Sequence, residues 1–126
     1  MKKILIISLF YSSIIFSEQV SIDQVRIVAE NFINSRSFQN TSVSSIDTYV
    51  KENQVVFYYV NFTPSGYILV SADNRIKPIL AYSYDKNFIL ENVPANIQLI
   101  FNQYYQEQQI IIEALESPTT DVLEKW

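Results

Sequence analysis

The chain has 126 residues, a formal net charge of −4 at pH 7, and neither cysteine nor histidine. Acidic chains with few lysines and arginines bind nucleic acid and anionic membranes poorly. If the binding partner of this chain is charged, we expect it to be basic. The missing cysteine and histidine exclude a disulfide framework, the usual soft metal ligands and the usual catalytic base. We therefore expect no metal, no cofactor and a fold stabilised by packing.

Residues 1–17 have the pattern of a secretory signal peptide. Lys2 and Lys3 form a positive start, residues 4–16 are mostly apolar, and Ser17 is a small residue suited to precede a cleavage site. The apolar run is too short for a stable membrane span. The alternative is an uncleaved amphipathic or buried helix. Cleavage would leave residues 18–126 as one secreted or periplasmic domain without membrane association.

Export predicts a processed N-terminus. Mass spectrometry of the exported protein should find its first residue at or near Glu18, because the polar sequence begins there. The formal net charge would fall from −4 to −6 with the loss of Lys2 and Lys3. An intact Met1 on the exported protein would contradict this prediction.

A first helix is predicted after Ser21. Ser21 and Gln24 have the spacing of a capping box, in which the serine hydroxyl and the glutamine side chain bond reciprocally to the helix start. Apolar residues then recur at helical spacing on one stripe. The stripe consists of Ile22, Val25, Ala29, Phe32 and Ile33. It ends near Arg36, and the polar residues 37–45 form a loop or a weak strand entry.

From residue 44 to residue 85 the apolar pattern becomes that of strands, rich in β-branched and aromatic residues. Four strands are predicted, at residues 46–50, 55–62, 67–72 and 79–84. Polar turns separate them, at residues 51–54, 63–66 and 73–75. In the second turn Pro64 fixes φ and Gly66, the only glycine, supplies a positive φ. Connections this short indicate antiparallel neighbours.

A second helix is predicted toward the C-terminus, with Asn92 as its cap and Pro94 in its first turn. Its stripe runs about five turns and is apolar except at Gln108. The stripe residues are Ile97, Ile100, Phe101, Tyr104, Gln108, Ile111 and Leu115. Ser117 and Pro118 end the helix, and residues 119–126 form a short tail.

The strands at residues 55–62 and 67–72 carry apolar side chains on both faces. In a sheet with one face exposed to water, apolar and polar side chains would instead alternate along each strand. Both faces should therefore be covered, by the two helices or by a partner, and helices on both sides is the simpler arrangement. We predict a single α+β domain: an antiparallel meander of about four strands packed with an N-terminal and a C-terminal helix.

No catalytic residues are predicted. Ser-His and Cys-His pairs are impossible without histidine and cysteine. The thirteen Asp and Glu residues are scattered through turns and helix flanks, as on a solvated surface. The sequence shows neither a calcium loop nor a glycine-rich phosphate cradle. We expect a protein that is not an enzyme.

Three segments resemble a known protein family: residues 58–62, 66–75 and 78–83. Together they closely resemble the propeptide of the streptopain family of secreted cysteine proteases and the freestanding Spi-type inhibitors related to it. Phe88, Asn96, Ile97 and Tyr104 also fall where the family has matching residues. The resemblance covers about residues 20–115, with Ala81 as a departure where the family usually has glycine.

The resemblance implies a fold that packs against a streptopain-like cysteine protease and blocks its active site. In the family an asparagine at the start of the last helix projects toward the catalytic centre, and the catalytic histidine is held out of place. Asn96 is the matching position, and an ordinary polar residue of a first helical turn is the alternative. We place the inhibitory contact from Phe88 through Asn92 and Pro94 to Asn96.

Several functions are compatible with this resemblance. Residues 122–126 resemble the junction before the mature protease in related proenzymes, so the chain is a freestanding inhibitor or a propeptide fragment. A trans-acting folding chaperone of such a protease is a second function. An envelope binding domain without a protease partner is a third. A neighbouring streptopain-like protease gene would favour the first two, and refolding that protease with and without this protein would separate them.

Overall fold

The computed structural model describes residues 19–36, 40–115 and 117–126, so the predicted signal peptide lies outside the described residues. The elements in chain order are α1 (Ile22–Ser35), β1 (Ser42–Lys51), β2 (Gln54–Thr63), β3 (Tyr67–Ser71), β4 (Ile79–Ser83), α2 (Ala95–Ala114) and α3 (Thr120–Leu123). The strands form one antiparallel sheet in the order β1-β2-β3-β4. The predicted α+β meander is confirmed. Within the described ranges, no helix has the length and apolarity needed to cross a bilayer.

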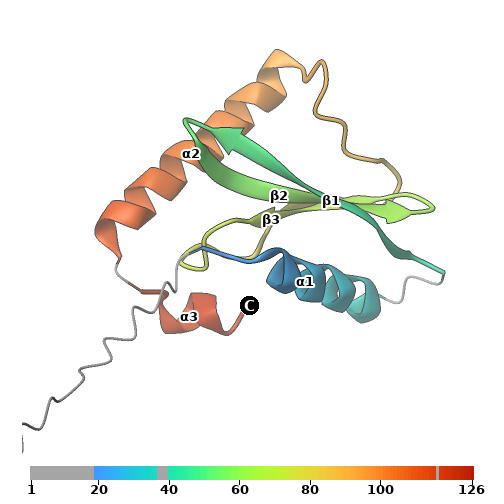
Figure 1. Ribbon diagram of the computed structural model, residues 1–126, viewed down its shortest axis with the longest axis horizontal. Helices are drawn as coiled ribbons and strands as arrows, with labels where there is room; N and C mark the ends of the chain where they lie inside the picture. Colours follow the sequence, from blue (N-terminus) through green and yellow to red (C-terminus); the bar gives the residue numbers. More distant parts are fainter. Residues whose placement is uncertain (1–18, 37–39, 116) are drawn as a thin grey trace, which may run out of the picture.

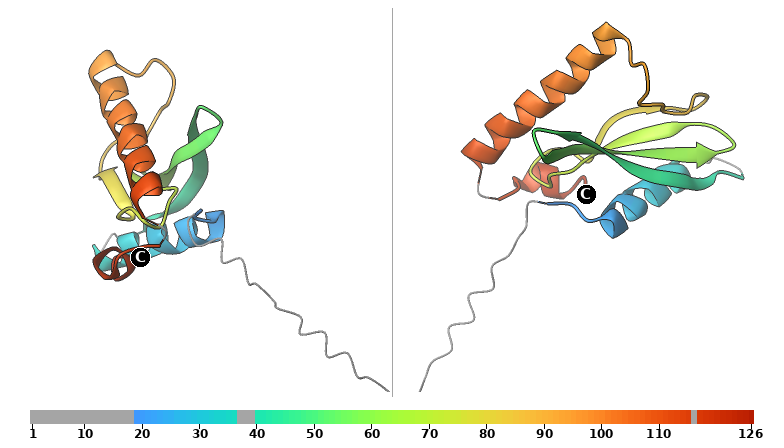
Figure 2. Two further views of the ribbon diagram at one scale, coloured as in Figure 1. Left: turned by 90° about the vertical axis from the view of Figure 1, so that its left-hand side faces the viewer. Right: turned by 45° about the horizontal axis from the view of Figure 1, so that its top comes forward.

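The two long helices lie on opposite faces of the sheet (Figures 1 and 2). Successive side chains of a strand point to opposite faces, so β2 supplies both cores. Tyr58, Val60 and Phe62 pack with α1, whereas Phe57 packs with Phe101 of α2. The expectation that helices cover both faces is therefore confirmed.

The first strand is longer than predicted. It begins at Ser42 rather than at residue 46, because Ser42 pairs with Thr63 across the β1–β2 hairpin. This half of β1 is rich in serine and alternates between exposed and half-buried positions. As an edge strand it pairs with β2 alone, so its order comes from β2 and not from its own apolar content.

The turns have the backbone conformations that their residues favour. Glu52 and Asn53 both have positive φ, at 52° and 60°, as a two-residue hairpin loop requires. Gly66 has φ of 105°, so the predicted positive φ is confirmed, and the Thr63–Pro64 peptide is cis. The turn closes with a hydrogen bond from Phe62 N–H to the Gly66 carbonyl at 2.9 Å.

The start of α2 differs from the prediction. Pro94 is the N-cap residue, in an extended conformation with ψ of 150°, and the first helical residue is Ala95. Proline also disfavours a helical conformation at the preceding residue, Val93. Asn92 is thus too far from the first turn to cap it, and it has a left-handed φ of 56°. Ile100, predicted in the buried stripe, is 39% exposed.

The C-terminal residues are docked and partly helical, so the short tail was an incomplete prediction. Thr119 caps α3, accepting a hydrogen bond from Val122 N–H at 3.4 Å. The Trp126 indole N–H donates to the Ile76 carbonyl at 2.9 Å, and its ring packs against the core cluster of α1. This contact brings the end of the described chain beneath the sheet on the α1 side (Figure 1).

Candidate functional site

The loop between β4 and α2 is built around the ring of Phe88. This ring is half-buried on the α2 face of the sheet. It lies 4.8 Å from the Tyr59 ring, 5.4 Å from the Tyr67 ring and 5.8 Å from the Phe101 ring, measured between centroids. Phe88 therefore supports the loop from beneath, while the residues after it reach the surface.

Asn61 of β2 holds the backbone of the same residue. Its side-chain amide donates to the Phe88 carbonyl at 3.1 Å, and its amide oxygen accepts from Phe88 N–H at 2.6 Å. Both backbone groups of Phe88 are thereby paired, although the loop belongs to no strand. Sequence reasoning did not assign Asn61 a role, yet a polar residue inside an apolar strand was a visible signal.

Replacing Asn61 with alanine should release this loop. Two hydrogen bonds to half-buried backbone groups would be lost, at a cost of about 1–3 kcal/mol in the free energy of unfolding. Hydrogen exchange should then show faster exchange of the Phe88 amide. Ser83→Ala, which removes only an exposed hydrogen bond to Asp85, is the matched control. Unchanged protection of Phe88 N–H in Asn61→Ala would show that the loop is held by other contacts.

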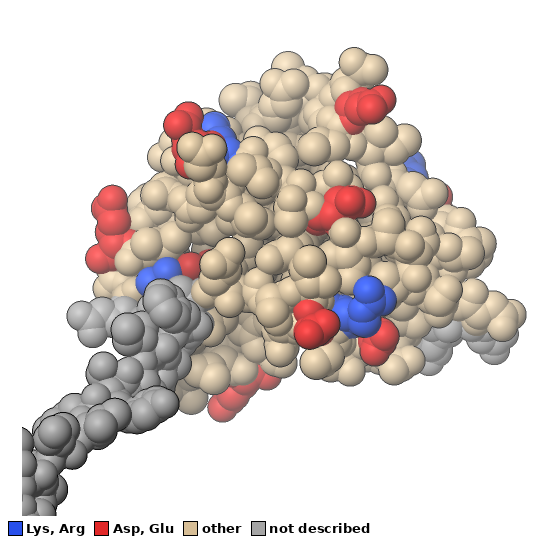
Figure 3. Space-filling view, viewed as in Figure 1, with Lys and Arg blue, Asp and Glu red and all other residues tan. Residues whose placement is uncertain are grey.

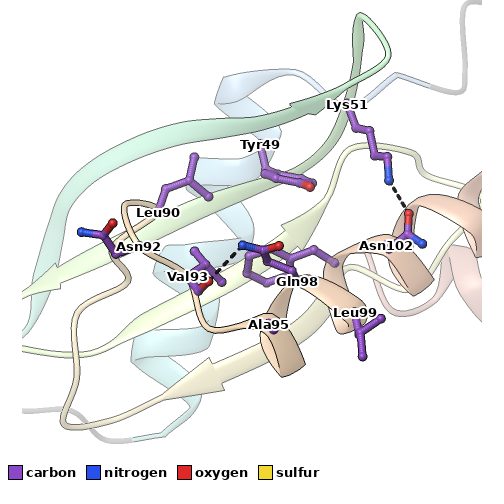
Figure 4. A pocket seen from close by; sticks show the side chains of 10 residues that line it. Tyr49, Lys51, Leu90, Asn92, Val93, Ala95, Gln98, Leu99 and Asn102 are labelled. Atoms are coloured by element: carbon purple, nitrogen blue, oxygen red, sulfur yellow. Dashed lines mark hydrogen bonds between the residues drawn. The ribbon is translucent and has the colours of Figure 1, made fainter.

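The segment from Asn92 to Asn96 forms the outer edge of the site. Asn92, Pro94 and Asn96 are all exposed. The Pro94 carbonyl accepts from the N–H groups of Ile97 and Gln98 at 3.0 Å. The Gln98 side chain also donates to the Val93 carbonyl at 3.0 Å (Figure 4). The helix thus fixes the backbone from one side, and the Asn61–Phe88 pair fixes it from the other.

Asn96 has its side chain free for a partner. It lies in the first turn of α2, is exposed, and forms no side-chain hydrogen bond to another residue within the described ranges. An amide carries two donor hydrogens and an acceptor oxygen. The structure thus brings three of the four predicted contact residues together on one exposed segment, with Phe88 packed beneath it.

A groove of about 880 Å³ separates the end of β1 from the start of α2 (Figure 4). Apolar and aromatic side chains line it, and they are Tyr49, Leu90, Val93, Leu99 and Phe101. Amide side chains line it as well, and they are Asn92, Gln98 and Asn102. Lys51 closes one end, donating to the Asn102 side chain and lying 5.1 Å from the centre of the Tyr105 ring. We call this hollow the α2 groove.

The first half of α2 and the segment before it carry no charged residue of their own. Residues 92–106 contain no Asp, Glu, Lys or Arg, although the whole chain is acidic. Figure 3 shows charged side chains scattered over the visible face, with few of them near the upper end of the helix. Leu99, which borders the α2 groove, is 66% exposed. Few charges and an exposed large apolar residue are features of protein-binding surfaces.

Two partly buried hydrogen bonds, from the side chains of Gln108 and Tyr104, fix α2 on the sheet. Gln108, only 2% exposed, donates to the Val55 carbonyl at 3.1 Å, which explains a polar residue in the apolar stripe. Tyr104 donates to the Leu80 carbonyl at 3.4 Å. Burial raises the pKa of Tyr104, and the negative charge of Glu107 raises it further. The tyrosine therefore remains a neutral donor well above neutral pH.

The described residues contain no cluster of three or more acidic, histidine or cysteine residues that could hold a metal. Ser83 and Lys86 have the Ser-x-x-Lys spacing of some serine hydrolases. The Ser83 hydroxyl donates to Asp85 at 3.1 Å, however, and Lys86 is exposed. An exposed lysine lacks the desolvated surroundings in which lysine acts as a base.

Comparison with known proteins gives one match. A family model described as Spi protease inhibitor matches residues 17–108. No curated protein and no solved structure matches the chain. The matched region includes the whole sheet, the Phe88 loop and α2 as far as Gln108, and so contains the complete site described above.

Proposed function

Because this chain belongs to the Spi protease inhibitor family, we propose that it inhibits a streptopain-like cysteine protease by covering the active site of that enzyme, as a propeptide does. The family suggests a protease as partner and an inhibitor that is not itself an enzyme. The cysteine protease as target and occlusion as mechanism are our proposal. The N-terminal sequence further leads us to propose that the protein acts outside the cytoplasm, as a secreted or periplasmic protein.

The exposed amide of Asn96 on a fixed helix start is the observation that carries this proposal. The segment before it is held by Asn61 and by Gln98 through hydrogen bonds to backbone groups. A segment that is ordered before binding loses less conformational entropy in the complex. A short polar side chain at such a position can enter a cleft without rearrangement of the backbone behind it.

The expected contact is of ordinary size for a protease–inhibitor pair. Such complexes bury about 800 Å² on each partner, and a few central residues carry most of the binding energy. We assign the central role to Asn96, with Asn92 and Pro94 beside it. Phe88 acts from beneath by holding the loop, because its ring packs against Tyr59, Tyr67 and Phe101.

Asn96→Ala should weaken inhibition while leaving the melting temperature nearly unchanged. Loss of a central buried hydrogen-bonding group costs about 1–3 kcal/mol of binding free energy, or roughly 5- to 150-fold in affinity. The cost to folding is small because Asn96 is exposed. The measurement is the inhibition constant against the streptopain-like protease of the same organism.

The matched control is Gln106→Ala, an exposed amide farther along the same helix. It should inhibit like the wild type. Wild-type inhibition by Asn96→Ala would remove Asn96 from the contact. Absence of inhibition by the unmodified protein would refute the proposed function.

A further inference from the structure

The α2 groove continues directly from the proposed contact. Asn92 and Val93 line this groove and also line a second hollow of about 330 Å³. Pro94 borders the second hollow, and Ala95 borders the α2 groove. A protein seated on the segment from Asn92 to Asn96 would therefore lie next to the α2 groove.

We propose that the α2 groove takes up an uncharged, extended loop of the target protease that lies outside the catalytic centre. The inhibitor would then hold the enzyme at two adjacent places, at the active site through Asn96 and at this loop through the groove. This inference rests on the proposed function, since the occupant is a part of the protease.

The chemistry of the groove matches an extended polypeptide. Its aromatic and aliphatic residues, among them Tyr49 and Phe101, can receive an apolar side chain. The amides of Asn92, Gln98 and Asn102 supply both donors and acceptors. An extended segment presents N–H and C=O groups along its length, so it can use both kinds of partner.

The charges of the groove exclude a strongly charged occupant. Lys51 is the charged side chain among the residues that line it. Its ammonium group is already engaged by Asn102 and by the Tyr105 ring. A basic segment would enter without an ion pair and would lose its hydration, and an acidic segment could pair only with Lys51, in competition with Asn102 and the Tyr105 ring. An uncharged segment does not have this cost, and the exposed Leu99 at the border adds apolar contact.

Filling the groove tests the inference. Ala95 is exposed and borders the groove, so Ala95→Trp adds a large side chain there without disturbing the core. We expect the inhibition constant to rise about 10-fold or more, which corresponds to ~1.4 kcal/mol of lost binding free energy. Ala114→Trp, at the exposed far end of the same helix, is the matched control and should inhibit like the wild type.

A second variant controls for the possibility that Ala95→Trp weakens inhibition only by altering the start of α2. Leu99→Glu places a charge at the border of the groove, at a position that is 66% exposed, and should weaken inhibition as well. Raising the salt concentration from about 0.05 M to about 0.5 M should change the wild-type inhibition constant less than about 2-fold, because the proposed occupant is uncharged.

Each result bears on one of the two claims. Wild-type inhibition by both Ala95→Trp and Leu99→Glu would overturn the groove as a binding site and leave the proposed function intact. If added salt weakens inhibition by the wild type about 10-fold or more, the assignment of an uncharged occupant would be overturned. Failure of the wild type to inhibit would overturn the proposed function itself, and the inference with it.

Discussion

Gly66→Val is expected to lower the free energy of unfolding by about 2–5 kcal/mol, from backbone strain of about 1–2 kcal/mol and steric overlap of about 1–3 kcal/mol. The strain arises because φ at Gly66 is 105°, a conformation that a β-branched residue rarely adopts. The overlap arises because a Cβ there would lie 2.9 Å from the Ser83 carbonyl oxygen and 3.1 Å from that of Tyr84. Both are backbone atoms and cannot turn aside.

Urea unfolding followed by tryptophan fluorescence measures this effect, because Trp126 is the only tryptophan and packs against the core. Ser65→Ala is the control in the same turn. It removes one exposed hydrogen bond to the Tyr84 carbonyl and should cost about 1 kcal/mol or less. An unfolding midpoint of Gly66→Val equal to that of the wild type would refute the importance of this turn.

Arg75→Met is expected to destabilise the protein by about 3–5 kcal/mol, because it leaves a buried carboxylate without its cationic partner. Asp73 is 4% exposed and Arg75 is 8% exposed. Arg75 donates from Nη2 and Nε to the two oxygens of Asp73, at 2.7 and 2.9 Å. It also donates to the Leu115 carbonyl at 2.9 Å, just beyond the end of α2.

The double variant Asp73→Asn with Arg75→Met separates the two contributions. It removes the unpaired charge and should recover part of the stability lost in Arg75→Met, as measured by urea unfolding. The remaining deficit would belong to the contact with Leu115 and to the packing of the arginine. A loss below about 1 kcal/mol in Arg75→Met would show that Asp73 finds another partner or becomes solvated.

The fold was largely predictable because its signals are local. β2, β3 and β4 are mostly apolar, with many β-branched and aromatic residues, and Gly66 marks the turn between β2 and β3. The first half of β1 was missed because its serine-rich sequence becomes a strand only through pairing with β2. The predicted cap at Asn92 was wrong because Pro94 is itself the N-cap, so the helix begins two residues later than predicted.

The sequence indicated which segment is exposed but not the contacts that hold it in place. Asn96 was assigned from the family resemblance, and Asn92 and Pro94 from the expected helix start, and the structure exposes all three. The Asn61–Phe88 bonds join residues 27 positions apart, and the Arg75–Leu115 bond joins residues 40 positions apart. Such pairs depend on how the loop and the helix fold back on the sheet, and this arrangement cannot be predicted from a local sequence pattern. The expected contact of these residues with a protease stays a prediction.

The most direct test of occlusion is the rate at which iodoacetamide alkylates the catalytic cysteine of the streptopain-like protease, with and without a saturating amount of residues 18–126. We expect the bound inhibitor to slow alkylation about 10-fold or more, because the thiolate would no longer be accessible. Mass spectrometry should find the inhibitor uncut after the same incubation. Alkylation at the rate of the free enzyme, in a mixture where binding has been verified, would contradict occlusion of the active site.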